Sequence, residues 1–145
     1  MIIRQRGAGE HDRVLAIWRR AVDATHGFLS PEDRRAIEAQ LGEFLPQTPM
    51  WVAECDGEVQ GFMVLHGGMI EALFIDPDRH GSGVGSALIA HALDLAPHAK
   101  VDANEQADNA VPFYEARGFQ RIGRSDHDDQ GRPYPIIHFR HPGRE

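Results

Sequence analysis

The stretch from Met69 to Leu95, MIEALFIDPDRHGSGVGSALIAHALDL, decides the fold. Its first seven residues are almost wholly apolar, which is typical of an interior strand that is covered on both faces. Asp76-Pro77 predicts the end of this strand, because proline has no N–H group to donate to a neighbouring strand. Glycine then occupies every second position from 81 to 85, and apolar residues recur at helical spacing after it. A glycine loop that leads into a helix N-terminus predicts a binding site for an anion, particularly a phosphate.

Length and composition indicate one soluble domain that spans residues 1–145. Apolar residues make up 41% of the chain, and no run approaches the roughly 20 apolar residues of a membrane span. The first residues lack the apolar segment of a secretion signal, and Cys55 is the single cysteine, so we expect a cytoplasmic protein without membrane partners or disulfides. The formal net charge of −7 disfavours nucleic acid as a partner and favours cationic partners such as amines.

The rest of the chain supplies the other elements of an α/β fold. Asp56-Gly57 is a strong signal for a hairpin turn, and Ser30-Pro-Glu-Asp predicts the start of a helix with Ser30 as its N-cap. The inner face of that helix is expected to carry Ile37, Leu41, Phe44 and Leu45. The remaining expected elements are strands at 2–5, 51–55, 59–65, 100–104, 119–124 and 135–140, and helices at 10–25 and 108–117. We therefore expect a mixed, mostly antiparallel sheet of about seven strands with four helices on both faces, in the order β-αα-βββ-α-β-α-ββ.

Three segments together resemble the GNAT family of acetyltransferases. His80-Gly-Ser-Gly-Val-Gly-Ser-Ala-Leu is similar to the family's pyrophosphate loop, Gln/Arg-x-x-Gly-x-Gly/Ala. Leu73-Phe-Ile-Asp-Pro resembles its fourth strand, and Asn104…Asn109-x-x-x-Phe-Tyr-x-x-x-Gly-Phe resembles its fifth strand and the following helix. The order of elements matches from end to end. His80 departs from the pattern, because the family usually has Gln or Arg there, so phosphate recognition should rest on backbone amides.

The resemblance implies a GNAT fold and an acetyl-CoA-dependent N-acetyltransferase, which moves the acetyl group directly onto a primary amine. The acceptor would be a small-molecule amine or a protein lysine, and the protein would act as a monomer or homodimer without a metal. A CoA-binding sensor or interaction module without turnover is the alternative. The residues expected to contact the cofactor are Leu73, Phe74, Ile75, His80, Gly81, Ser82, Gly83, Val84, Gly85, Ser86, Asn104, Asn109, Phe113 and Tyr114.

Tyr114 and Glu71 are the candidate catalytic residues. A phenol stays protonated at neutral pH and can donate to the departing CoA thiolate, although a buried tyrosine bonded to a carbonyl is the alternative. Glu71 is a charged residue in an apolar strand, so burial would raise its pKa and make it a general base, unless its side chain simply reaches solvent. His26 and Glu105 are reserve bases.

The link between the first two helices offers the candidate acceptor site. His26 and Phe28 either line a substrate pocket or belong to a plain connector. His138 and His141 are expected to face solvent near the end of the chain, and no convincing Ser-His-Asp or Cys-His arrangement is found.

Overall fold

The computed structural model describes residues 1–107 and 109–143. The strands are β1 (Ile2–Gln5), β2 (Trp51–Cys55), β3 (Glu58–His66), β4 (Met69–Ile75), β5 (Lys100–Asn104), β6 (Gln120–Ser125) and β7 (Ile136–Arg140), and the helices are α1 (His11–Thr25), α2 (Pro31–Phe44), α3 (Val84–Leu95) and α4 (Ala110–Ala116), with short 3₁₀ turns η1 (Leu45–Gln47) and η2 (Pro77–Arg79). One seven-stranded sheet has the order β1-β2-β3-β4-β5-β7-β6, with β4 and β5 parallel and the other neighbours antiparallel. This confirms the predicted fold and order of elements.

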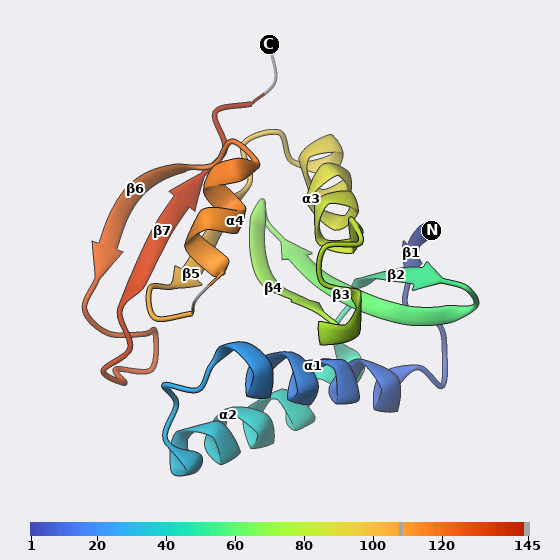
Figure 1. Ribbon diagram of the computed structural model, residues 1–145, viewed down its shortest axis with the longest axis horizontal. Coiled ribbons are helices and arrows are strands. Elements are labelled where there is room, and N and C mark those ends of the chain that lie inside the picture. Colours follow the sequence, from blue (N-terminus) through green and yellow to red (C-terminus); the bar gives the residue numbers. More distant parts are fainter. Residues whose placement is uncertain (108, 144–145) are drawn as a thin grey trace.

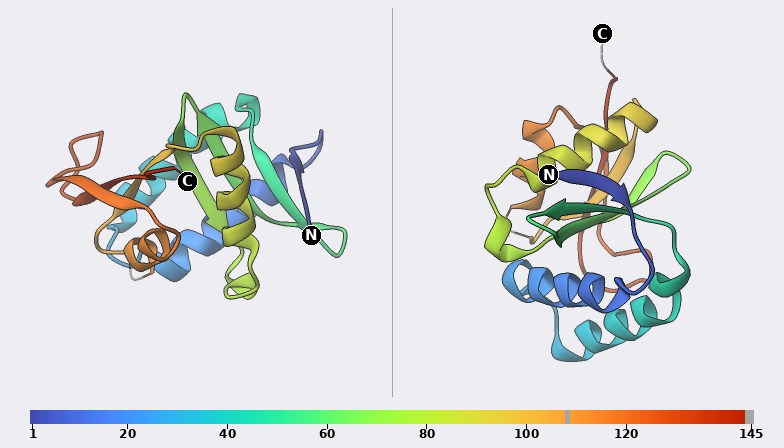
Figure 2. Two further views of the ribbon diagram at one scale, coloured as in Figure 1. Left: turned by 90° about the horizontal axis from the view of Figure 1, so that it is seen from above. Right: turned by 90° about the vertical axis from the view of Figure 1, so that its right-hand side faces the viewer.

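The helices cover the two faces of the sheet, two on each (Figures 1 and 2). In the right-hand view of Figure 2, α1 and α2 lie below the sheet and α3 lies above it. One buried cluster joins α1 to β2 and β3, around Ile17, Trp18 and Phe62. A second cluster joins α3 to β5 and β7, and Leu88 and Phe139 are fully buried in it.

Helix α2 begins as predicted but packs less deeply. The Ser30 hydroxyl accepts a hydrogen bond from the Asp33 N–H group at 3.1 Å, so Ser30 is the N-cap. The expected inner face is wrong at Phe44, which is 51% exposed, while Ile37 and Leu41 are partly buried. The reason is that the helix stops at Phe44 and the chain tightens into η1, which turns Leu45 inward instead.

The turn between β2 and β3 has the conformation that its sequence favours. Asp56 has φ 54° and Gly57 has φ 81°, so both central residues are left-handed. Two-residue turns of this kind match the right-handed twist of the two strands. The hairpin places β3 in the middle of the sheet, beside the strand that borders the candidate site.

Strands β4 and β5 pair over a short distance only. Their register joins Met69 to Lys100 and Ile70 to Val101, and no further pairs follow between them in the described part of the chain. On the other side of β4 the register shifts, because Leu65 pairs with Ile70 while Val64 pairs with Ala72. Glu71 is therefore the extra residue of a β-bulge. The second half of β4 is left without a strand on its β5 side, and its main-chain groups there are open to a ligand.

Helix α4 begins later than the sequence predicts. The expected helix ran from Asp108 to Arg117, but Asp108 lies outside the described residues and the helix comprises Ala110–Ala116. Gly118 follows it with φ 91°, and the N–H group of Phe119 donates to the carbonyl of Tyr114 at 3.1 Å. This is the glycine-terminated helix end that the sequence predicted.

Candidate active site

A cavity of about 350 Å³ opens between β4, the glycine loop, α4 and the end of α1. Most of the residues expected to contact the cofactor line it, namely Leu73, Phe74, Ile75, His80, Gly81, Gly83, Val84, Gly85, Asn109, Phe113 and Tyr114. Ser82, Ser86 and Asn104 do not line it. Thr25, the first residue of the predicted link, and Arg79, for which no role was predicted, do line it.

The glycine loop leaves backbone donors free at the start of α3. Gly81 has φ 79° and Gly83 has φ 88°, conformations that other residues adopt only with strain. Gly83 is the N-cap of α3 and supplies no side chain, so no cap occupies the N–H groups of the first turn. These groups, with the positive end of the helix dipole, fit a pyrophosphate. His80 is exposed, as expected if the backbone makes the main contacts.

Asp76 fixes the start of this loop to α1. Its carboxylate is 2% exposed and accepts hydrogen bonds from Arg13 at 2.9 Å and from the Asp78 N–H group at 3.0 Å, with Arg20 at 3.4 Å. Burial alone would raise the pKa of Asp76, but these donors and charges lower it overall. Sequence reasoning took Asp76 only as part of a turn, since its two arginine partners lie more than 50 residues away.

Tyr114 is a buried residue in the wall of the cavity. It is 7% exposed and packs against the rings of Phe113, Phe119 and Phe139 at centroid distances of 5.2, 5.6 and 5.9 Å. Burial raises the pKa of its phenol above the usual 10.0. Within the described residues no hydrogen bond of its hydroxyl is found, in contrast to the alternative of a tyrosine bonded to a carbonyl. The phenol therefore remains a donor for a group in the cavity.

His26 lies at the opposite wall, at the end of α1. It lines the cavity, whereas Phe28 packs behind it with a centroid distance of 5.2 Å and contacts Tyr134 in turn at 5.7 Å. The Tyr134 hydroxyl donates to Asp33 and accepts from the Ser30 N–H group, which ties the loop before β7 to α2. The predicted link thus combines a cavity residue, His26, with a supporting residue, Phe28.

Neither glutamate lies in the cavity. The expected burial of Glu71 is wrong, and its side chain reaches solvent instead: it is 51% exposed, and its carboxylate lies 3.7 Å from His66 Nδ1. The cause is the end of β4–β5 pairing at Ile70, which leaves no neighbouring strand over Glu71. Glu105 is bound to Arg124 at 2.6 Å, and hydrogen bonding to Arg124 lowers its pKa, so it is a weak base.

Strands β5, β6 and β7 hold a Ser-His-Asp arrangement that sequence reasoning missed. His138 Nδ1 lies 2.7 Å from Asp102 Oδ1, and its Nε2 lies 2.7 Å from Ser125 Oγ. Asp102 and His138 face each other across β5 and β7, so only the strand register brings them together. None of the three lines the cavity. His141 is also not solvent-facing as predicted, because its ring is buried and lies 3.2 Å from the carbonyl of Arg117.

Comparison with known proteins decides the family. Residues 20–134 match the family described as Acetyltransferase (GNAT) domain, which is more than half of the chain. The chain belongs to the GNAT acetyltransferases. The GNAT fold and the predicted enzyme class, an N-acetyltransferase, are therefore confirmed.

Close GNAT relatives are similar along the whole chain. The chain is 48% identical to "Peptidyl-lysine N-acetyltransferase YjaB" from Salmonella typhimurium over 141 residues, covering 97% of each, and 48% identical to the Escherichia coli protein of the same name over 143 residues, again with 97% of each covered. The solution structure of apo-form YjaB from E. coli superimposes with a TM-score of 0.90 at 46% identity, over 99% of this chain and 100% of that one.

A more distant GNAT structure shares the fold alone. The PaiA N-acetyltransferase from Thermoplasma acidophilum, solved in complex with coenzyme A, has a TM-score of 0.72 at 16% identity and covers 95% of this chain and 98% of its own. Over residues 1–107 and 109–143, no group of three or more His, Cys, Asp or Glu side chains could hold a metal ion. No helix in the same ranges is long and apolar enough to cross a membrane.

Proposed function

We propose that this GNAT enzyme transfers the acetyl group of acetyl-CoA directly to the side-chain amine of a protein lysine. The observation that carries the proposal is one cavity with free backbone donors at its mouth and an unpaired buried phenol, Tyr114, further in. The names of two relatives 48% identical to the chain, both peptidyl-lysine N-acetyltransferases, support lysine as the acceptor. The formal charge of −7 also suits a cationic acceptor.

The residues at the cavity mouth fit the charged end of coenzyme A. The N–H groups of the first turn of α3 would hold the pyrophosphate, and the open edge of β4 at Leu73, Phe74 and Ile75 would pair with the amides of the pantetheine arm. Phe113 closes the side of the cavity and is held by the Arg117 guanidinium, which lies 4.2 Å from its ring. When bound, acetyl-CoA supplies the activated acetyl thioester.

Tyr114 would donate a hydrogen bond or a proton to the departing sulfur. A thiolate that forms in this apolar surrounding lacks water to stabilise it, and the phenol is the buried donor that lines the cavity. Because burial raises the pKa of Tyr114, the hydroxyl keeps its proton until the sulfur becomes basic enough to share or take it. No acyl-enzyme is needed, and Cys55 does not line the cavity.

The test compares the chain's two tyrosines. Tyr114→Phe should lose about 10²–10³-fold in kcat, with CoA affinity unchanged by calorimetry and stability nearly unchanged, since the removed hydroxyl has no partner among the described residues. Tyr134→Phe should do the reverse: it loses stability, because its hydroxyl is bonded to Asp33 and Ser30, and keeps kcat at saturating peptide. Full activity of Tyr114→Phe refutes the role of Tyr114. Binding of acetyl-CoA without release of the CoA thiol in the presence of any lysine peptide refutes the proposed acetyl transfer to lysine.

A further inference from the structure

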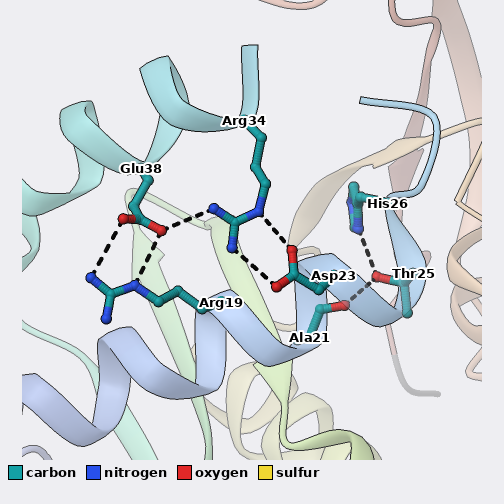
Figure 3. A network of polar contacts seen from close by, with 7 residues as sticks. All are labelled: Arg19, Ala21, Asp23, Thr25, His26, Arg34 and Glu38. Carbon is teal, nitrogen blue, oxygen red and sulfur yellow. Dashed lines mark hydrogen bonds and ion pairs between the residues drawn. The ribbon is translucent and has the colours of Figure 1, made fainter. Parts of the chain in front are cut away.

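His26 ends a chain of hydrogen bonds that begins at the backbone of α1 (Figure 3). The Thr25 hydroxyl contacts the carbonyl of Ala21 at 2.7 Å and the Nδ1 atom of His26 at 2.6 Å. On the other side of the ring, His26 Nε2 lies 3.2 Å from the side-chain nitrogen of Asn104. Every polar atom of the imidazole therefore has a partner.

The partners fix the tautomer of His26. A carbonyl oxygen can only accept, so the single proton of the Thr25 hydroxyl is donated to Ala21. The hydroxyl oxygen must then accept from His26, which places the ring proton on Nδ1. Nε2 is left as an acceptor, and the amide nitrogen of Asn104, which can only donate, satisfies it. The lone pair of Nε2 is thus the basic site of the ring.

The surroundings favour the neutral ring. His26 is half-buried between the rings of Phe28 and Phe74, at centroid distances of 5.2 and 6.4 Å, and this desolvation lowers its pKa below the usual 6.5. The nearest acid along α1, Asp23, is bound to Arg34 at 2.6 Å and does not contact the ring (Figure 3).

The other titratable groups around His26 come from the elements that share its cavity. These groups are Tyr114 of α4, Arg79 of η2 and His80 of the glycine loop. On the β5 side the ring meets neutral Asn104. No carboxylate among the described residues pairs with His26, so a neutral base at physiological pH is the expected state.

We infer that His26 is the general base of the acetyl transfer, that Thr25 positions it through the Nδ1 proton, and that Asn104 caps Nε2 until the acceptor enters. The inference rests on the proposed function. The amine nitrogen forms a bond to the acetyl carbon as the carbon–sulfur bond breaks. The surplus proton on nitrogen passes to His26 Nε2, and the sulfur receives the proton of Tyr114; both residues are restored by exchange with solvent. His26 replaces Glu71 in this role, since Glu71 is half-exposed and outside the cavity.

The first test follows kcat/KM for a lysine peptide against pH in the wild type and in His26→Gln. Turnover needs a neutral amine and a neutral His26, so log(kcat/KM) should rise with a slope of about two below the pKa of His26 and about one above it. His26→Gln should lose about 10²–10³-fold and show a slope of about one throughout. An unchanged break in slope in His26→Gln overturns the inference. Calorimetry should show equal CoA affinity in both proteins.

The second test separates positioning from simple support. Thr25→Val should lower kcat/KM by about tenfold and move the break in slope to lower pH, because the imidazolium loses its Nδ1 acceptor. Thr25→Ser keeps the hydroxyl, so kcat/KM and the pH of the break in slope should both match the wild type. Thr48→Val is the matched control, since Thr48 donates to the carbonyl of Phe44 at 2.7 Å in the same manner but at the end of α2. Equal effects of Thr25→Val and Thr48→Val overturn the role of Thr25.

A third readout does not depend on activity. Long-range nitrogen–proton NMR spectra should show the Nδ1–H tautomer of His26 in the wild type and in Thr25→Ser, and a mixture of tautomers in Thr25→Val. An Nε2–H tautomer in the wild type refutes the inference. A wild-type protein that acetylates no amine refutes the proposed function. If the wild type is active and His26→Gln is equally active with the same slopes of log(kcat/KM) against pH, only the assignment of His26 as the base is refuted.

Discussion

Gly61 leaves no room for a side chain beneath the cavity. It lies in β3 opposite Ile75 of β4, and a Cβ atom placed on it would be 2.8 Å from Ile75 Cδ1, 3.0 Å from Val84 Cγ1 and 3.2 Å from the carbonyl oxygen of Phe74. The end of the Ile75 side chain can rotate away, but the Phe74 carbonyl belongs to the backbone. Gly61→Ala therefore has to push β4 away from β3 or shift the start of α3.

The expected magnitude follows from two opposed effects. Overpacking a tight core costs about 1–3 kcal/mol, while alanine recovers about 0.5–1 kcal/mol of the backbone entropy that glycine loses in a strand. Taking the middle of each range, Gly61→Ala should reduce the free energy of unfolding by about 1 kcal/mol, which lowers Tm by about 2–4 °C in a protein of this size. Since Ile75 and Val84 line the cavity, CoA affinity should fall as well.

Urea denaturation measures the first effect and calorimetry with CoA the second. Gly42→Ala is the control: Gly42 lies in α2, and a Cβ there meets no atom within 4 Å, so alanine should stabilise the protein by about 0.5–1 kcal/mol without changing CoA binding. We expect the urea midpoint to fall in Gly61→Ala and to rise in Gly42→Ala, with equal m-values in the two variants. A Gly61→Ala protein as stable as the wild type, with intact CoA affinity, would refute the idea that β3 sets the position of β4.

Three further perturbations address the loop and the sheet edge. Gly83→Ala meets no atom within 4 Å, so its cost of about 1–2 kcal/mol comes from the left-handed φ of 88° alone; denaturation should show that loss, and calorimetry a weaker CoA affinity. Asp76→Asn leaves Arg13 without its charged acceptor and should destabilise the protein by about 2 kcal/mol. Because Asp76 holds the start of the glycine loop, the free energy of CoA binding should fall by more than the free energy of unfolding. A hydrogen bond from Arg4 lowers the pKa of Glu10 from 4.5 to about 2, so its stabilisation is present above pH 4.5 and is lost as the pH falls toward 2. Glu10→Gln should flatten the pH dependence of unfolding in that range, and an unchanged acid limb would contradict this assignment.

Features set by local chemistry could be predicted from the sequence. The Asp56-Gly57 turn depends on two residues that tolerate positive φ, and the cap at Ser30 depends on a hydroxyl three residues before its N–H partner. The glycine loop is of the same kind, because the strand, the turn and the helix start are adjacent in the chain. The part of the candidate site that Met69–Leu95 contributes was accordingly placed on the correct elements.

Features set by register and strand divergence could not be predicted. Glu71 stands in an apolar stretch, which indicates burial, but a bulge and the early end of β4–β5 pairing expose it. Asp102, His138 and Ser125 meet only because three strands pair in one particular register. No periodicity within a single element carries that information.

Helix α1 links the two ends of the candidate site. Its Arg20 contacts Asp78 at 2.9 Å and Asp76 at 3.4 Å at the base of the glycine loop, and the helix ends at Thr25, which contacts His26. A helix rises about 1.5 Å per residue, so about 7.5 Å of rigid helix separates Arg20 from Thr25. Because the same helix carries Arg20 and the Thr25–His26 pair, we expect a ligand that orders the loop through η2 to fix the position of His26 as well.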